Sequence, residues 1–475
     1  MPERLRRTAS WLGLLVWLGA FPSAAVEVPP AGSCPPYSLP DSGRPGDEDV
    51  SPPSFEPGST VEHGQLGRLR DHLPPEVWQH RAEFFYEGME IRVGPCHRRY
   101  PAPEAFRAAT LANAGRVTLD ADGGLHGFDG EGLPFDPGAI PDHAPDAGMR
   151  WAWSHRYRYL GAGLRGDFRI IHILRRGRKT ERFEGSFFLL PMHGYPGADG
   201  GSNGVRFWAG GRFLRPAMAR GLAWRQIRRS ESDWKANRSD DVFVYLPDAR
   251  RVKRAALTTL DGLFVPTYTR GQQAGGGSLN LPDQSGGTPD VQISAAEHSR
   301  RGFVGLILRP NAWRFQLLRS RDVLAPINAD YFGYPANADR SYGPSGLSVA
   351  NGRWEIRRAV VLRGARKRPE GPIASLTLYI DALTLAPLYL ITRKANEAIK
   401  EVGIFVGRFS GDDPLAVRWA GSGKGFGTIL PVAESFFVAG EGGWLRESFE
   451  VRSDPPSSEE RRRFTSVNPL QRRGR

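Results

Sequence analysis

The sequence predicts a mainly β protein of the α+β class, in which a large curled antiparallel sheet or incomplete β barrel has helices closing one face. Two observations carry this prediction. Up to about residue 160 the apolar residues recur at helical spacing, and after Leu164 they alternate with polar residues in many short stretches. The 57 Gly and 39 Pro supply the turns that short strands need.

The first 25 residues have the three-part layout of a secretory signal peptide. Arg4, Arg6 and Arg7 precede an apolar run from Trp11 to Phe21, and small residues follow up to Ala25. This run is too short to cross a bilayer as a helix, which needs about 20 apolar residues. We therefore predict that residues 1–25 are a cleaved signal peptide and that the protein is exported to the periplasm. The alternative is that the segment is retained as an amphipathic anchor. Cleavage lowers the formal net charge from +13 to +11, since three Arg and Glu3 leave.

Export also changes what the basic excess means. It argues against nucleic acid as a partner and leaves an anionic membrane surface or an acidic partner. An association with the outer membrane or with an inner- or outer-membrane transporter is compatible with this charge.

Two segments interrupt the globular pattern. Residues 26–67 are rich in Pro, Gly and acidic residues and predict a flexible leader. Residues 68–475 predict a single β-rich domain with a Gly-rich flexible loop at 266–289, either a lid or a surface insertion. The two cysteines, Cys34 and Cys96, predict a disulfide in an exported protein, with lipid attachment at Cys34 as the rival interpretation.

Three helices are expected before the strands. Helical spacing of apolar residues marks Pro75–Tyr86, Pro103–Ala114 and Asp146–Tyr159. The second opens with Pro and is followed by Gly115, as helix start and stop signals predict. A further helix can lie within residues 216–229.

Eleven strands are expected after Leu164 because residues alternate between an apolar and a polar face. In one of them Leu376, Leu378 and Ile380 alternate with Thr377 and Tyr379. Short connections favour a meander of hairpins, and so many strands should curl. The expected strands are 168–174, 182–190, 242–246, 303–308, 313–318, 353–362, 375–381, 387–393, 402–409, 434–439 and 444–452.

The usual catalytic motifs are missing from the sequence, so we expect no catalytic residue and no cofactor. It contains no Gly-x-Ser-x-Gly, His-Glu-x-x-His or Cys-x-x-Cys motif. Residues 421–427 resemble a phosphate loop but lack its spacing, which favours a Gly-rich turn. His126 and His143 lie near several Asp residues, yet without metal-ligand spacing, so a solvated acidic loop is favoured over a metal site.

Basic and aromatic residues are the remaining candidates for binding. A run of four cations after a predicted strand suggests a basic contact surface for headgroups or an acidic partner: Arg250, Arg251, Lys253 and Arg254. If the curled sheet is incompletely filled, its aromatic residues would line an apolar cavity for a lipid or other hydrophobic ligand. The candidates for that cavity are Trp153, Tyr157, Phe243, Tyr245, Trp313 and Phe315.

Several of these stretches resemble an exported bacterial family, domain of unknown function 1329. The resemblance is carried by Gly132–Phe135, Trp151–Gly161, Asp240–Arg254, Tyr379–Leu388 and the terminal Phe464-Thr with its final Arg-Gly-Arg. It extends over about residues 70 to 475, with Lys253 where Arg is usual and with the two cysteines as departures. It implies a fold like that of periplasmic lipoprotein carriers and of outer-membrane lipoprotein-sorting proteins, with no established catalytic residue.

Two hypotheses for function follow. The first is a non-catalytic periplasmic carrier or chaperone of a lipid or other hydrophobic ligand, working in the cell envelope beside a membrane exporter. The second is a structural envelope protein that binds a membrane transporter or cell-wall polymer through its basic surface.

Overall fold

The computed structural model describes residues 56–472 except for short gaps. The residues outside the description are 1–55, 175–178, 196–197, 199–203, 248–249, 256–260, 267–298, 301–302, 331–342, 344–345, 369–372, 414–424, 441 and 473–475. The signal peptide, most of the leader, Cys34 and nearly all of the 266–289 loop therefore lie outside the described residues. The pairing of Cys34 with buried Cys96 stays a prediction.

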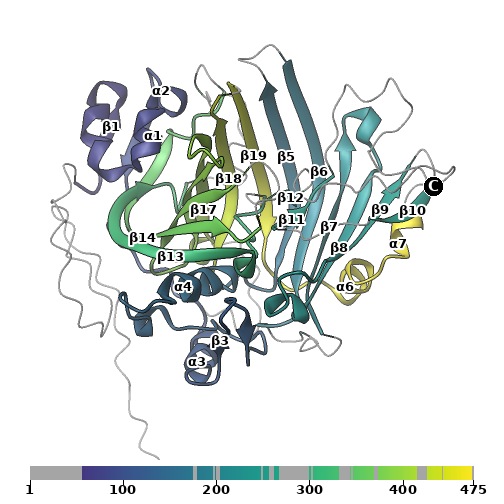
Figure 1. Ribbon diagram of the computed structural model, residues 1–475. Helices are drawn as coiled ribbons and strands as arrows, with labels where there is room; N and C mark the ends of the chain where they lie inside the picture. The colour runs from purple at the N-terminus through teal and green to yellow at the C-terminus, as the bar shows by residue number, and fades with distance from the viewer. Residues whose placement is uncertain are drawn as a thin grey trace, which may run out of the picture.

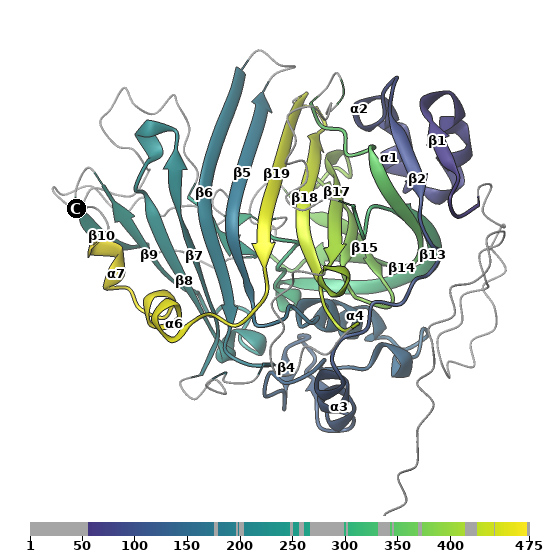
Figure 2. The same ribbon diagram turned by 180° about the vertical axis from the view of Figure 1, so that it is seen from behind.

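A fifteen-stranded sheet dominates the molecule, which confirms the mainly β prediction (Figures 1 and 2). It consists of two antiparallel meanders that meet where β19 pairs with β5. One meander comprises β5 (Leu164–Leu174), β6 (Lys179–Pro191), β7 (Val205–Arg215), β8 (Ala223–Arg229), β9 (Asp241–Leu246) and β10 (Arg251–Ala255). The other comprises β13 (Trp313–Ala325), β14 (Gly352–Arg366), β15 (Ser375–Asp381), β16 (Pro387–Arg393), β17 (Ile399–Phe409), β18 (Ile429–Val438) and β19 (Gly443–Arg452).

The sheet is mixed and is not closed into a barrel, so of the two expected forms the large curled sheet is the one observed. Two N-terminal strands, β1 (Thr60–Glu62) and β2 (Glu90–Val93), extend it, and β2 pairs with β14 in parallel. The path through the sheet ends at β1 on one side and at β10 on the other, so these strands are edges. Smaller two-stranded sheets are formed by β3 (Thr118–Leu119) with β4 (Leu125–His126) and by β11 (Leu263–Phe264) with β12 (Ser299–Arg300).

The helices lie around the sheet rather than within it. A 3₁₀ helix over His63–His72 is followed by α1 (Pro75–Gln79) and α2 (Arg81–Phe84), which lie beside β1. Next come α3 (Glu104–Ala112) and α4 (Ala147–Arg156). In both views α6 (Ser458–Phe464) and α7 (Pro469–Arg472) lie beside β7–β10, at the opposite end from α1 and α2.

Two expectations about local structure were wrong, and one long strand was missed. Residues 303–308 form a buried irregular segment instead of a strand, with Val304 and Leu306 at φ of 60° and 64°. Within residues 216–229, only a 3₁₀ turn over Ala217–Ala219 is helical, and β8 follows it. Strand β7 was not expected at all.

Ordered structure also begins before residue 68. Val61 of β1 is fully buried within the stretch expected to be a flexible leader. The division of the chain into domains otherwise stays a prediction.

The irregular segment 303–308 fills the inner face of the sheet, which we define as the face it covers. Phe303 makes edge-to-face contacts with Phe168, Phe187 and Phe449 at centroid distances of 5.3 to 5.6 Å. Further along, Leu306 and Leu308 pack into the core that α4 shares with β13–β18. The inner face is therefore a packed core, because these residues replace the water that an empty trough would hold.

The opposite, outer face is covered at both ends of the sheet. Residues of α1, α2 and β2 pack over the β14–β18 half. Over the β5–β9 half, Phe464 of α6 stacks on Phe188 of β6 at 4.3 Å. This C-terminal cover leaves space between the helices and the sheet.

Candidate ligand-binding cavities

The largest of the cavities described here lies on the outer face, under α6 and α7. Its volume is about 610 Å³, within the ordinary range for ligand sites. We call it the arginine cavity, since six arginines line it: Arg165, Arg212, Arg220, Arg225, Arg452 and Arg463. Only two acidic residues, Asp167 and Glu460, line it as well.

Strand alternation explains why arginines gather there. In β7 the residues Phe207, Ala209 and Phe213 pack on the inner face, so Arg212 and Leu214 point to the outer face. The same period places Arg225 of β8 and Tyr245 of β9 on that outer face. Neighbouring strands thus bring cationic and apolar side chains into one wall.

Apolar side chains form the other part of the lining. Phe188, Leu214, Tyr245, Phe464 and Leu470 all contribute. Leu214 is 41% exposed. The cavity thus combines apolar contact area with positive charge.

The arginines differ in how they are neutralised. Arg165 forms an ion pair with Asp454 at 2.7 Å, and Arg452 forms one with Glu460 at 2.8 Å. In the described part of the chain, Arg212, Arg220 and Arg463 have no carboxylate within ion-pair distance. These three guanidinium groups are the ones available to an anionic ligand.

The helix that covers the cavity is fixed by a capping box. The Ser457 hydroxyl accepts a hydrogen bond from the Glu460 amide at 3.2 Å, and the Glu460 carboxylate accepts one from the Ser457 amide at 3.0 Å. Burial opposes ionisation of Glu460, but the Ser457 amide, Arg165 and Arg452 outweigh it and hold the pKa of Glu460 below its usual value. This carboxylate therefore stays charged and orients the start of α6.

A second cavity, of about 470 Å³, lies beside α3 and is more apolar. Its lining includes Phe106 and Leu111 of α3 together with Leu133, Leu385 and Ile429. Leu111 is 64% exposed. This α3 cavity offers apolar contact, and fewer charged residues line it than line the arginine cavity.

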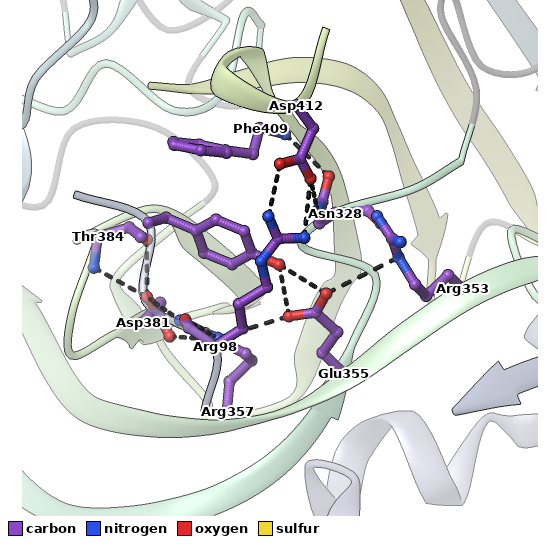
Figure 3. A network of polar contacts seen from close by, with 10 residues as sticks. Arg98, Asn328, Arg353, Glu355, Arg357, Asp381, Thr384, Phe409 and Asp412 are labelled. Carbon is purple, nitrogen blue, oxygen red and sulfur yellow. Dashed lines mark hydrogen bonds and ion pairs between the residues drawn. The ribbon is translucent and has the colours of Figure 1, made fainter. Parts of the chain in front are cut away.

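A buried polar network lies behind the α3 cavity and holds its wall (Figure 3). Arg357 of β14, which is fully buried, donates to both carboxylate oxygens of Asp381 at 2.8 and 3.0 Å. Asp381 also accepts from the amide and the hydroxyl of Thr384, at 2.8 and 2.7 Å. The guanidinium therefore ties β14 to the β15–β16 turn, which contributes Thr384 to the cavity wall.

The same network ties the segment before α3 to the sheet. Tyr100 donates to Glu355 of β14 at 2.6 Å, and its ring lies under the guanidinium groups of Arg98 and Arg357 at 5.0 and 5.1 Å. Arg98 in turn forms a two-pronged pair with Asp412, at 2.8 and 2.5 Å. The described carboxylates of this network are all paired, so their charges stabilise and position backbone segments.

Burial governs the protonation of the network. It raises the pKa of Glu355, against the opposing effect of Arg357, and it raises the pKa of Tyr100. For Arg357, burial lowers the pKa, but Asp381 outweighs this and the net pKa is raised. Arg357 thus stays charged and is the central cation of the cluster.

The structure brings four of the six aromatic candidates together. Trp153, Trp313 and Phe315 are at most 3% exposed and pack in the core beneath α4, with Tyr157 at its border. Trp313 donates to Asp261 at 2.9 Å, and Tyr157 donates to Asp233 at 2.7 Å. Their place is a packed core, and ligand binding by them stays a prediction.

The other two aromatic candidates, Phe243 and Tyr245, lie on β9 and face the outer side of the sheet. Phe243 packs against the small cluster around Met192 and Ile227. Tyr245 is 3% exposed and lines the arginine cavity. The six residues therefore do not form one site.

The predicted basic contact surface lies at the sheet edge, on and just before β10. Arg250, Arg251 and Arg254 are exposed, and Lys253 is half-buried. Arg254 pairs with Asp241 of β9 at 2.5 Å. None of the four lines the arginine cavity.

The acidic loop around His126 is compact. His126 and Asp120 are joined at 2.8 Å, and the described residues contain no group of three or more side chains placed to hold a metal ion. Among the same residues, no helix is both long enough and apolar enough to cross a membrane.

Sequence reasoning missed Arg212, Arg220 and Arg225. The signal was present, because residues 205–215 alternate with period two. The adjacent Gly210-Gly211 pair and the following Pro216 obscured that alternation.

The chain was also compared with known proteins. Residues 60–267 match the family described as "Protein of unknown function (DUF1329)". No curated protein matches the chain.

Several solved structures are similar to it. A domain from Vibrio parahaemolyticus, described by its name as sorting outer membrane lipoproteins, is 12% identical with a TM-score of 0.40, covering 69% of this chain and all of that one. A DUF1329 family protein from Desulfovibrio piger is 13% identical with a TM-score of 0.38, covering 69% and 98% of the two chains. A LolA superfamily protein from Nitrosomonas europaea is 11% identical with a TM-score of 0.34, covering 66% and 94%.

The family match confirms the resemblance drawn from the sequence for the segments Gly132–Phe135, Trp151–Gly161 and Asp240–Arg254, whereas Tyr379–Leu388 and the C-terminal residues lie outside the matched range. The chain therefore carries the sequence pattern of the DUF1329 family over residues 60–267.

Proposed function

We propose that this protein is a non-catalytic periplasmic carrier or chaperone that holds an anionic amphipathic ligand, such as a lipid, in the arginine cavity. The observation that carries the proposal is the lining of this cavity of about 610 Å³. Three arginines without a carboxylate partner in the described chain lie there beside Phe188, Leu214 and Phe464. A headgroup would bind the guanidinium groups, and the apolar part would contact the aromatic wall.

The periplasmic location in this proposal is supported by the signal peptide expected at residues 1–25. A membrane exporter or another envelope protein would deliver or receive the ligand. The paired state of the described carboxylates in the network of Figure 3 favours a binding role over a catalytic one.

Binding of a short-chain lipid by two matched variants tests the proposal. One variant carries Arg212→Gln, Arg220→Gln and Arg463→Gln in the cavity. The other carries Arg250→Gln, Arg251→Gln and Lys253→Gln at the sheet edge. Both remove three positive charges, so a difference between them reports position rather than net charge.

The binding assay uses a fluorescent short-chain phosphatidylglycerol as the anionic lipid and phosphatidylcholine of the same chain length as the comparison. Because a hydrogen bond to a charged group contributes about 1.5–3 kcal/mol, the cavity variant should bind the anionic lipid at least tenfold more weakly. The edge variant should bind as the wild type does. Loss of binding in the edge variant alone would instead support the structural envelope protein with a basic docking surface.

A further inference from the structure

A small pocket on the inner face, separate from the arginine cavity, gathers buried cations without acidic lining residues. Its volume is about 60 Å³, and it lies where α4 ends, between β6 and β7. Leu189 and Phe207, which line it, belong to the inner-face core. Three arginines and one histidine line it: Arg156, Arg158, Arg206 and His193.

All three arginines are buried: the residues Arg156, Arg158 and Arg206 are 8%, 7% and 5% exposed. Arg206 is neutralised, since it donates to Asp233 at 2.6 Å. Arg158 donates only to backbone carbonyls, those of His155 at 3.0 Å, Leu306 at 3.3 Å and Gly305. Neutral carbonyl oxygens satisfy its hydrogen bonds but leave its charge unbalanced.

Arg156 has the fewest polar partners of the three arginines. Its guanidinium lies over the rings of Tyr157 and Phe207 at 5.1 and 5.3 Å. No hydrogen bond or ion pair of its side chain occurs within the described part of the chain. A buried guanidinium in contact with rings alone is costly, because the rings replace only part of its hydration.

Burial opposes the charge of both unpaired arginines, and Asp233 and Asp240 offset only part of this effect at Arg156, whose pKa is lowered. Burial lowers the pKa of Arg158 to about 9, and the neighbouring charge of Arg156 adds to this effect. Burial also lowers the pKa of His193 to about 4, so this ring is neutral at pH 7. An anion placed between the two arginines would offset the repulsion between them.

We propose that this pocket binds one phosphate-type oxyanion, held by Arg156 and Arg158, with Arg206 and His193 at its border. The volume suits such a group: at about 10–15 Å³ for each water-sized probe, it has room for a few water molecules or one tetrahedral anion. A whole lipid or nucleotide is too large for it. The source of the anion is either free phosphate or the phosphate of an esterified headgroup whose remainder stays outside.

The proposal does not depend on the carrier function, because the arginine cavity and this pocket lie on opposite faces of the sheet. Its test uses the purified mature protein, dialysed free of phosphate, at constant ionic strength. Calorimetric titration with inorganic phosphate and with sn-glycerol 3-phosphate separates the two sources, and sodium chloride serves as the ionic control.

The diagnostic variant is Arg156→Met, which keeps apolar contact with Phe207 but removes the charge. Arg107→Met is the matched control, since Arg107 is exposed on α3 and pairs with Glu104. We expect saturable binding of one phosphate-type anion per chain in wild type and Arg107→Met, and at least tenfold weaker binding in Arg156→Met. Tighter binding of glycerol 3-phosphate would identify an esterified headgroup, and tighter binding of phosphate would identify the free ion.

The thermal unfolding temperature gives a second measurement, which does not depend on a calorimetric signal from phosphate binding. Without phosphate, Arg156→Met should unfold at or above the wild-type temperature, because an unbalanced buried charge is gone. The proposal is overturned if Arg156→Met binds phosphate as tightly as the wild type does. It is equally overturned if phosphate affects the wild type no more than chloride does.

Discussion

Replacing Arg357 with Met should destabilise the protein strongly, because the change removes the central cation of the network in Figure 3. The side chain is fully buried, and its partners Asp381 and Glu355 are 1% and 0% exposed. Met fills a similar volume, so the loss is mainly electrostatic. Breaking a buried pair by removing one partner costs about 3–5 kcal/mol, which is a large part of a typical stability of about 5–15 kcal/mol.

The same strand supplies a matched control. Arg363 of β14 forms an ion pair with Glu397 at 2.8 Å, but the two side chains are 46% and 58% exposed. Water screens such a pair, so Arg363→Met should cost no more than about 1 kcal/mol. The free energy of unfolding from urea titrations at pH 7.5 compares the two variants.

A measurement at lower pH separates lost charge pairing from lost packing. Burial raises the pKa of Glu355 while Arg357 opposes this effect, so without Arg357 the pKa of Glu355 should rise further above its value in the unfolded chain. Protonation of Glu355 as the pH falls then relieves the variant, so the difference in stability from wild type should narrow between pH 7.5 and pH 5. Equal costs for Arg357→Met and Arg363→Met, or a gap independent of pH, would refute the reasoning.

Two further predictions concern a histidine and a helix cap. The pKa of His193 is lowered to about 4 against an ordinary value of 6.5, so its contribution is complete above pH 6.5 and is lost as the pH falls towards 4. His193→Gln should flatten the pH dependence of stability in that window by at most about 3 kcal/mol, an upper bound because solvent screens the ring. Ser457→Ala removes the capping box of α6 and should destabilise this helix by about 1 kcal/mol, measured by amide hydrogen exchange in α6. An unchanged pH profile, or unchanged exchange, would contradict the respective prediction.

Strands could be predicted from the sequence wherever apolar and polar residues alternate without interruption. Strands β15 and β16 occupy the expected residues 375–381 and 387–393. Residues 303–308 misled the prediction because a short apolar run is equally consistent with a strand and with a buried irregular segment. The positive φ of Val304 and Leu306 depends on tertiary contacts, among them the hydrogen bonds from Arg158 to Leu306 and Gly305.

The cavity could not be predicted from the sequence because its residues are far apart along the chain. Arg165, Arg212 and Arg463 meet only after β19 pairs with β5 and after α6 folds back over β6. Periodicity predicts which residues share a face of one strand, but it does not predict which strands become neighbours. Periodicity also could not predict that residues 303–308 fill the inner face, where an empty trough would have let aromatic residues line a cavity.

The most direct test of the carrier proposal is mass spectrometry of what the protein holds. The chain would be expressed with its signal peptide, purified from the periplasm without detergent and extracted with organic solvent. The proposal predicts an anionic amphiphile at close to one molecule per chain, retained by the sheet-edge variant and lost from the variant of Arg212, Arg220 and Arg463. Wild-type protein without a co-purifying amphiphile, and without binding of phosphatidylglycerol, would contradict it.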